Sequence, residues 1–145
     1  MNKPISTKVH GVLDYLTAPT LIALPRALGW SKGLTNLLTG SGLGMLGYSM
    51  MTRYELGLFK VLPMRGHLTL DAMSGAMLAA TPFLPFAKQD RNGTTISILV
   101  GLGAFEIAAS LLTQPQPSLR EQLKEAGAGQ TLNALREKVT TAIGR

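Results

Sequence analysis

The chain contains the same pattern twice, and each copy is long enough to form two membrane-crossing helices. His10-Gly-Val-Leu-Asp14 is matched further along the chain by His67-Leu-Thr-Leu-Asp71. A second set of matches has a slightly larger offset, because the second copy has a longer loop: Gly40, Gly42, Ser49 and Thr52 correspond to Gly101, Gly103, Ser110 and Thr113. The sequence therefore predicts a tandem duplication of a two-helix unit, with repeat one over about 10–52 and repeat two over about 67–113.

Four segments are apolar enough to be predicted as transmembrane helices. Residues 34–51 contain no charged side chain, and the segments 12–28, 68–87 and 94–113 contain only one or two each. A helix needs about 20 residues to cross a hydrocarbon core of roughly 30 Å, and soluble helices usually carry a charged face. We therefore expect an all-α fold, a four-transmembrane-helix bundle made of two helical hairpins. The alternative is an unusually apolar soluble four-helix bundle.

Glycine and proline set the expected helix boundaries at about 10–25, 34–52, 67–86 and 94–113. Pro19 predicts a kink in the first helix. Gly40 and Gly44 share a face of the second helix, which would let another helix approach closely, either within one molecule or in a homo-oligomer. The middle loop, 53–65, is apolar for a linker, and we expect it either to lie on the membrane surface or to fold back on the bundle.

The character of the chain changes after Pro117, so we divide it into a membrane domain, 1–117, and a tail, 118–145. Ser118 and Glu121 have the spacing of a capping box, and spaced apolar residues follow among charged ones. The tail is predicted to be a cytoplasmic amphipathic helix. It would lie on the membrane, cover the cytoplasmic end of the bundle or bind a protein partner, and the sequence does not choose between these.

The basic residues indicate a topology rather than a nucleic-acid partner. The net charge is +6, but the lysines and arginines lie in short loops and in the tail, not on one face with interleaved aromatics. Ten of them are at the N-terminus, in the middle loop and in the tail, against four in the other two loops, so both termini should be cytoplasmic. The expected partners are the lipid bilayer and either a protein or a second copy, through the Gly face of the second helix, the middle loop or the tail. The absence of cysteine excludes disulfides and thiolate chemistry.

Five ionisable side chains fall within the inner half of the predicted bundle. His10 and Asp14 are spaced i and i+4, as are His67 and Asp71, and Glu106 lies about seven residues before the end of its helix. Ionisable groups in spanning helices are candidate sites, because burying them is costly. The candidate metal ligands are His10, Asp14, His67, Asp71 and Glu106. They would form a cation or proton site, or each His–Asp pair would be a structural clasp to the Arg53–Glu55 or Arg65 region.

Sequence motifs for catalysis are missing: there is no phosphate-binding glycine loop, no His-Glu-x-x-His and no Gly-x-Ser-x-Gly. We therefore predict no catalytic residue and no cofactor. The expected function is that of a small integral inner-membrane protein without enzymatic activity, acting as a structural or accessory subunit. The alternative is a small transporter or a cation- or proton-binding membrane protein that uses the inner His/Asp/Glu cluster.

A family resemblance rests on motifs spread over about 5–117. These are Ile5-Ser-Thr-Lys-Val-His-Gly-Val-Leu-Asp-Tyr15, the link from Thr52-Arg-Tyr-Glu-Leu-Gly57 to Leu62-Pro-Met64, His67 with Asp71, Ser74-Gly75 and Gly103-Ala-Phe-Glu106. The repeated unit resembles the Ser-Pro-Trp (SPW) repeat family of small bacterial membrane proteins. The tripeptide is replaced here by Leu24-Pro25-Arg26 and Thr81-Pro82-Phe83. The resemblance implies an integral inner-membrane protein and carries over no catalytic residue.

Overall fold

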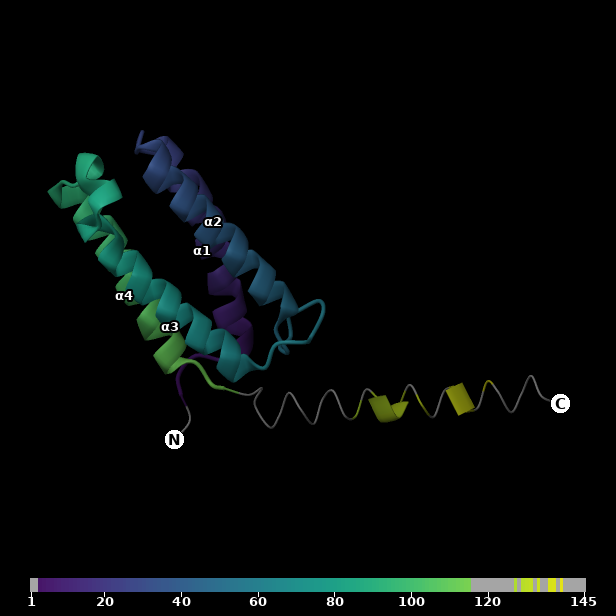
Figure 1. Cartoon of the computed structure of the whole chain (residues 1–145). Helices are drawn as coiled ribbons and strands as arrows, with labels where there is room; N and C mark the ends of the chain where they lie inside the picture. Colours follow the sequence, from purple (N-terminus) through teal and green to yellow (C-terminus); the bar gives the residue numbers. More distant parts are fainter. Residues whose placement is uncertain are drawn as a thin grey trace.

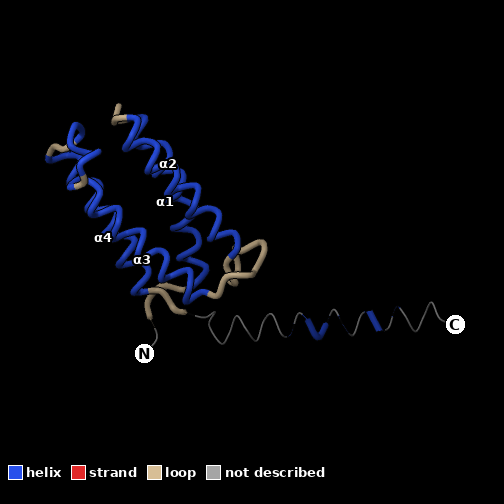
Figure 2. The backbone as a smooth tube through the Cα atoms, viewed as in Figure 1, coloured by secondary structure: helices blue, strands red, loops and turns tan. Residues whose placement is uncertain are grey.

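The structure is a computed structural model that describes residues 3–115 and, beyond them, positions 127, 129–131, 133, 136, 137 and 139. The elements are α1 (Thr7–Ala27), α2 (Lys32–Met51), α3 (Met64–Ala80), the short 3-10 helices η1 (Thr81–Phe83) and η2 (Pro85–Asp90), and α4 (Gly93–Leu112). All regular elements in the described part of the chain are helical, which confirms the all-α prediction (Figure 2). Most of the predicted tail, 118–145, lies outside the described residues.

The four long helices form two antiparallel hairpins, α1 with α2 and α3 with α4, which lie side by side (Figure 1). Side-chain caps set three of the helix starts: Ser6 accepts from Val9 N, Ser31 from Leu34 N and Asn92 from Thr95 N. Such caps satisfy backbone N–H groups that have no partner within the helix. Because Ser6 caps α1, this helix begins three residues before the predicted position.

The third helix ends earlier than predicted. We expected a helix to Phe86, but α3 stops at Ala80 and two 3-10 turns follow. A proline disfavours the helical conformation of the residue before it. Leu84, which precedes Pro85, is accordingly extended, with ψ of 152°. The prolines therefore replace the last two helical turns with a short cap over this end of the hairpin.

Each hairpin is packed through a glycine at its centre. A Cβ on Gly42 in α2 would lie 2.6 Å from the Ala18 carbonyl oxygen in α1, and a Cβ on Gly75 in α3 would lie 2.6 Å from the Gly103 oxygen in α4. A Cβ at Gly40 or Gly44 would have no neighbour within 4 Å, so the alternative in which this face packs within the molecule is wrong. Two residues of an α-helix turn through about 200°. A helix that packs Gly42 therefore turns Gly40 and Gly44 outward.

The segments before α1 and α3 tie the two hairpins together at one end. Ile5 forms a parallel bridge with Thr113, just after α4, and Leu62 forms the same bridge with Thr52, just after α2. These contacts follow the sequence repeat. Leu62 is the counterpart of Ile5, at the offset that relates His67 to His10, and Thr113 is the counterpart of Thr52. The first turns of α1 and α3, where the candidate histidines lie, are therefore held next to the ends of α4 and α2.

The middle loop folds back on the end of α2, as one of the two predicted alternatives requires. The amides of Leu58 and Phe59 donate to the Met50 carbonyl, at 2.7 and 3.0 Å, and the Val61 amide donates to Met51 at 2.8 Å. The side chains of Leu58, Phe59 and Val61 are nevertheless 68%, 67% and 55% exposed. The loop thus presents an apolar tip on a hydrogen-bonded backbone.

Among the described residues, α4 alone is long and apolar enough to cross a membrane by length and composition. The helix α3 has only 17 residues before the 3-10 turns. The mean hydropathy of α1 and α2 is lowered by histidine, aspartate, serine, threonine and glycine. The four predicted spans therefore stay a prediction.

Candidate functional site

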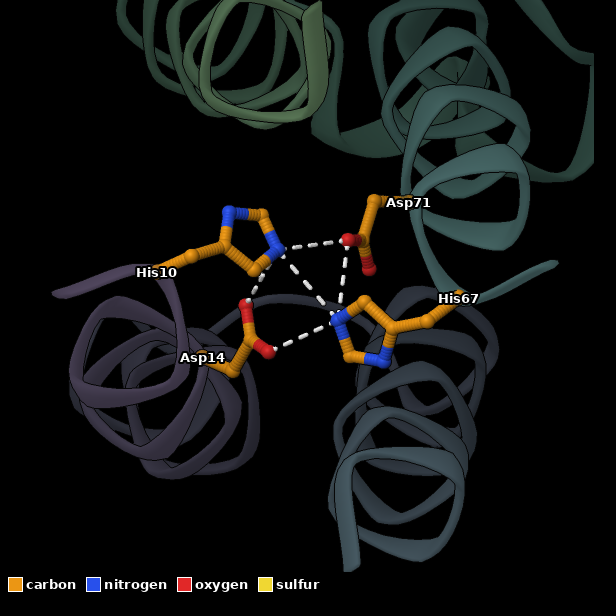
Figure 3. A group of neighbouring side chains, drawn as sticks. All are labelled: His10, Asp14, His67 and Asp71. Atoms are coloured by element: carbon orange, nitrogen blue, oxygen red, sulfur yellow. Dashed lines mark hydrogen bonds and ion pairs between the residues drawn. The ribbon is translucent and has the colours of Figure 1, made fainter. Parts of the chain in front are cut away.

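Two histidines and two aspartates meet between the hairpins. His10 and Asp14 lie on successive turns of α1, His67 and Asp71 on successive turns of α3, and all four point into the space between these helices (Figure 3). None is more than 5% exposed. One ligand atom from each lies within 4.8 Å of the others, as a single metal ion would require. We call these four residues the His2Asp2 centre.

The shortest contacts in the centre run between the two hairpins. His10 Nε2 lies 2.8 Å from Asp71 Oδ2, and His67 Nε2 lies 2.9 Å from Asp14 Oδ2. The contacts within one helix are longer, at 3.4 Å for His10–Asp14 and 3.1 Å for His67–Asp71. The two Nε2 atoms are 3.2 Å apart. The i,i+4 pairs that the sequence predicts are thus present, but each histidine makes its closer contact with the aspartate of the other repeat.

Each imidazole ring contacts one threonine hydroxyl through its Nδ1 atom, on the side away from the carboxylates. Thr113 Oγ1 lies 2.8 Å from His10 Nδ1, and Thr52 Oγ1 lies 2.8 Å from His67 Nδ1. Each hydroxyl also lies 2.6 Å from a main-chain carbonyl oxygen, that of Ala109 or Tyr48.

These threonine contacts assign the proton on each ring. A hydroxyl has one hydrogen to donate, and the carbonyl oxygen can only accept it. The threonine oxygen must therefore accept from Nδ1, so both histidines carry a proton on Nδ1. Both Nε2 atoms then face two carboxylates and each other. The described residues supply no donor between these atoms, so a second proton or a cation is needed there.

Two further side chains orient the carboxylates, and sequence reasoning missed them as members of the site. Ser49 Oγ donates to Asp14 Oδ2 at 3.1 Å, and the Tyr48 hydroxyl donates to Asp71 Oδ1 at 2.6 Å. Together with the two threonines, these make four side chains of the site that sequence reasoning missed. A signal for three of the four was present in the sequence, because Ser49, Thr52 and Thr113 belong to the repeated pattern. Tyr48 has no such signal, since its counterpart in the second repeat is Ala109.

Glu106 is adjacent to the centre but is not one of the four grouped ligands. Its side chain is 4% exposed, and the one hydrogen-bonding side chain that lies toward its carboxyl group among the described residues is Ser74 of α3, in a contact too long or too bent for a regular hydrogen bond. It lines a small cavity together with His10, Asp14 and Asp71. The predicted five-residue cluster is therefore a set of four, with Glu106 facing it across the small cavity.

The alternative clasp to the Arg53–Glu55 region is not what pairs the histidines and aspartates. Arg53 Nε donates to the Lys60 carbonyl at 2.8 Å, and Glu55 accepts from Thr7 Oγ1 at 2.9 Å. Only the Tyr54 ring approaches the centre, with its centroid 5.9 Å from that of His67. Burial raises the pKa of the Tyr54 phenol above its ordinary value, so this neighbour stays neutral.

The centre offers two imidazole nitrogens and two carboxylates, a donor set that suits divalent transition metals. A metal-bound imidazole is neutral and a metal-bound carboxylate is charged, so two ligands of each kind would balance a divalent cation. Comparison of the chain with protein-family models, curated proteins and solved structures finds no match.

Proposed function

We propose that this chain is a small integral membrane protein without enzymatic activity that binds a divalent transition-metal cation at the His2Asp2 centre. The observation that carries the proposal is the pair of Thr52 and Thr113 hydroxyls. By accepting from Nδ1 they direct the Nε2 lone pairs of both histidines toward the two carboxylates. Histidines that bind metals usually donate their other ring N–H to a fixed acceptor in this way.

Electrostatics support a cation more than a purely structural clasp. The side chains of two histidines and two aspartates converge here with at most 5% exposure, and buried charges are unfavourable unless they are paired or bind a metal. The mixed nitrogen and oxygen set is typical of sites for Zn²⁺ and its neighbours in the first transition row. We expect Zn²⁺ to be a suitable probe of the site.

The membrane location is part of the same proposal, with four transmembrane helices in the inner membrane and both termini cytoplasmic. It is supported by the distribution of side chains, because polar groups are buried between the helices while large apolar ones cover the outside. The exposed apolar residues of the four helices include Val12, Leu16, Leu43, Leu70, Met73, Met77, Val100, Phe105 and Leu111. The resemblance to the Ser-Pro-Trp repeat family and the origin by duplication belong to this proposal as well.

A Zn²⁺ titration of the protein purified in detergent tests the metal site. A ligand that binds only the folded state stabilises it by about 2.7 kcal/mol when its free concentration is 100 times Kd. We expect thermal unfolding to shift upward with Zn²⁺, and we expect Asp14→Asn and Asp71→Asn to abolish the shift because each removes a charged ligand at constant shape.

The matched control is Asp90→Asn, which neutralises a carboxylate that accepts from Ser31 N at the other end of the bundle. This variant should keep the full shift. A wild-type protein that shows no Zn²⁺-dependent shift and no bound zinc by elemental analysis, at saturating metal, would eliminate the proposed site.

A structural or accessory subunit is the second candidate, and the apolar loop tip favours it. Leu58, Phe59 and Val61 are exposed although their backbone is fixed against α2, and a rigid exposed apolar patch is typical of an interaction surface. Replacing all three by serine should reduce the size of the complex extracted from the native membrane in mild detergent, with Zn²⁺ binding unchanged. An unaltered complex would count against this role.

A further inference from the structure

The two repeats enclose two equivalent spaces, one between α2 and α3 and the other between α1 and α4. The first is a groove of about 300 Å³, and its lining includes Gly44, Met45, Tyr48, Leu70 and Ser74. The second is the cavity of about 10 Å³ beside the His2Asp2 centre, lined at the corresponding positions by Phe105, Glu106, Ala109, Leu13 and Thr17. Matching places in the duplicated unit therefore enclose a large groove in one case and a space for about one water molecule in the other.

The difference in volume follows from the side chains at two pairs of matched positions. Phe105 stands where the other repeat has Gly44, and its side chain lines the small cavity. In the groove, a Cβ on Gly44 would have no neighbour within 4 Å, so the same place is open. Ser41 and Leu102 differ in the same direction, with the smaller side chain in α2. The chain fills one space with its own side chains and leaves room for another molecule in the other.

The groove has the lining of a site for a flat apolar ring. Its large apolar side chains are three leucines and three methionines: Leu37, Leu70, Leu78, Met45, Met73 and Met77. Thioether sulfur makes favourable contacts with the edges of aromatic rings, and small-molecule sites are mostly apolar with a few polar groups that fix orientation. The phenyl ring of Phe105, in the equivalent space, indicates the shape of group that fits.

The open side of the groove faces lipid in the membrane arrangement proposed above. Leu70, Met73 and Met77 belong to the lining and are 39%, 64% and 56% exposed. A ligand would therefore enter from the bilayer, and it must itself be soluble in hydrocarbon.

One hydroxyl group in the groove remains available to a ligand. Of the four in the lining, those of Tyr48, Ser74 and Thr81 already lie toward acceptors of the protein. The fourth, that of Ser41, makes no hydrogen bond with any described residue. A hydroxyl has one proton to donate, so a carbonyl oxygen on the ligand would be a suitable acceptor.

We propose that the groove between α2 and α3 binds a membrane-soluble molecule with a flat ring that bears a carbonyl oxygen, the chemistry of a quinone. The ring occupies the place that Phe105 fills in the equivalent space, the methionines contact its edge, and Ser41 donates to its carbonyl oxygen. The inference adds a second ligand to the proposed membrane protein and does not depend on Zn²⁺ binding.

Binding of decylubiquinone to the protein in lipid nanodiscs tests the proposal, with empty nanodiscs as the blank. The wild type should bind one molecule per chain. Gly44→Phe and Ser41→Leu give the groove the side chains of the other repeat, so each should weaken binding by about tenfold or more through overlap with the ring. Gly40→Phe is the matched control, because Gly40 lies outside the groove lining and a Cβ there has no neighbour within 4 Å. It should bind as the wild type does.

A second comparison tests the carbonyl contact. Ser41→Ala keeps the groove open but removes the donor, so it should weaken decylubiquinone binding by about threefold to tenfold. The same variant should bind decylbenzene, which has the ring and the chain but no carbonyl, as the wild type does.

Three results would overturn the proposal. The first is a wild-type protein that does not bind decylubiquinone. The second is wild-type affinity in Ser41→Leu, which also decides the matter if Gly44→Phe does not fold. The third is equal affinity of the wild type for decylubiquinone and decylbenzene with no effect of Ser41→Ala, which would show that the groove takes hydrocarbon alone.

Discussion

Thr52 and Thr113 perform a task for which a hydroxyl at a helix end is well suited. Each follows the last residue of its helix and gives its only proton to the carbonyl four residues earlier, at 2.6 Å. The same oxygen is then restricted to accepting, which fixes one tautomer of the histidine from the other repeat. A carboxylate at the same place would also accept, but it would add a negative charge to an already acidic interior.

Replacing either threonine by valine should weaken Zn²⁺ binding by about 10–100-fold, the usual cost of removing an outer hydrogen bond to a metal ligand. Thr52→Val and Thr113→Val should have similar effects, because the two contacts have the same length. Competition with a zinc-binding dye measures the affinity.

Thr20→Val is the control for this prediction, because the Thr20 hydroxyl makes the same bond to the carbonyl four residues earlier, that of Leu16, but contacts no histidine. It should bind Zn²⁺ as the wild type does. Equal losses in all three variants would show that the hydroxyls act on helix stability and not on the centre.

At the scale of the elements, each hairpin depends on one contact between backbones. Gly42 meets the Ala18 carbonyl, and Gly75 meets that of Gly103, and this closeness places α1 against α2 and α3 against α4. Helices packed through small residues approach closely enough for extensive van der Waals contact. The position of Asp14 opposite Ser49 follows from this packing, since their bond of 3.1 Å joins the same two helices.

Gly42→Ala should therefore destabilise the protein by about 1–3 kcal/mol, the usual cost of overpacking. Gly40→Ala, two residues away with no neighbour within 4 Å, should instead stabilise α2 by about 0.5–1 kcal/mol, since glycine is unfavourable within a helix. Thermal unfolding of the two variants in the same detergent compares them. A lower melting temperature for Gly40→Ala would indicate that its face is packed against another chain.

At the scale of the whole molecule, the two hairpins meet where the polar groups are buried. The bridges of Ile5 with Thr113 and of Thr52 with Leu62 surround the His2Asp2 centre at one end. At the opposite end, Asp90 accepts from the Ser31 amide. A cation in the centre would thus join the two repeats through ligands from both, and its removal should loosen the contact between the hairpins more than either hairpin itself.

The proposed topology makes a prediction about accessibility from the two sides of the membrane. With both termini cytoplasmic, Lys32→Cys and Lys88→Cys should react with an impermeant thiol reagent added outside, and Lys60→Cys should react only after the membrane is opened. The reason is that basic residues are retained preferentially on the cytoplasmic side. Labelling of Lys60→Cys and Lys88→Cys from the same side would rule out the four-span arrangement.

The sequence by itself determined the elements and the residues available to them. Apolar runs between glycine and proline positions locate the starts of the four long helices to within three residues and the ends of α1, α2 and α4 to within two, but α3 ends six residues before the predicted Phe86. The repeat also singled out His10, Asp14, His67 and Asp71, since an i,i+4 spacing places each pair on one helix face.

Only the tertiary structure decided how these groups meet. The closer His–Asp contacts join residues of different repeats. The threonine hydroxyls that contact the histidines come from the residues that follow α2 and α4. Glu106 lies beside the centre and is not one of its four grouped ligands. Local periodicity fixes the face on which a side chain lies, but which two faces come into contact depends on the packing of all four helices. Gly42 rather than Gly40 sets that packing, because only one face of α2 can lie against the Ala18 carbonyl.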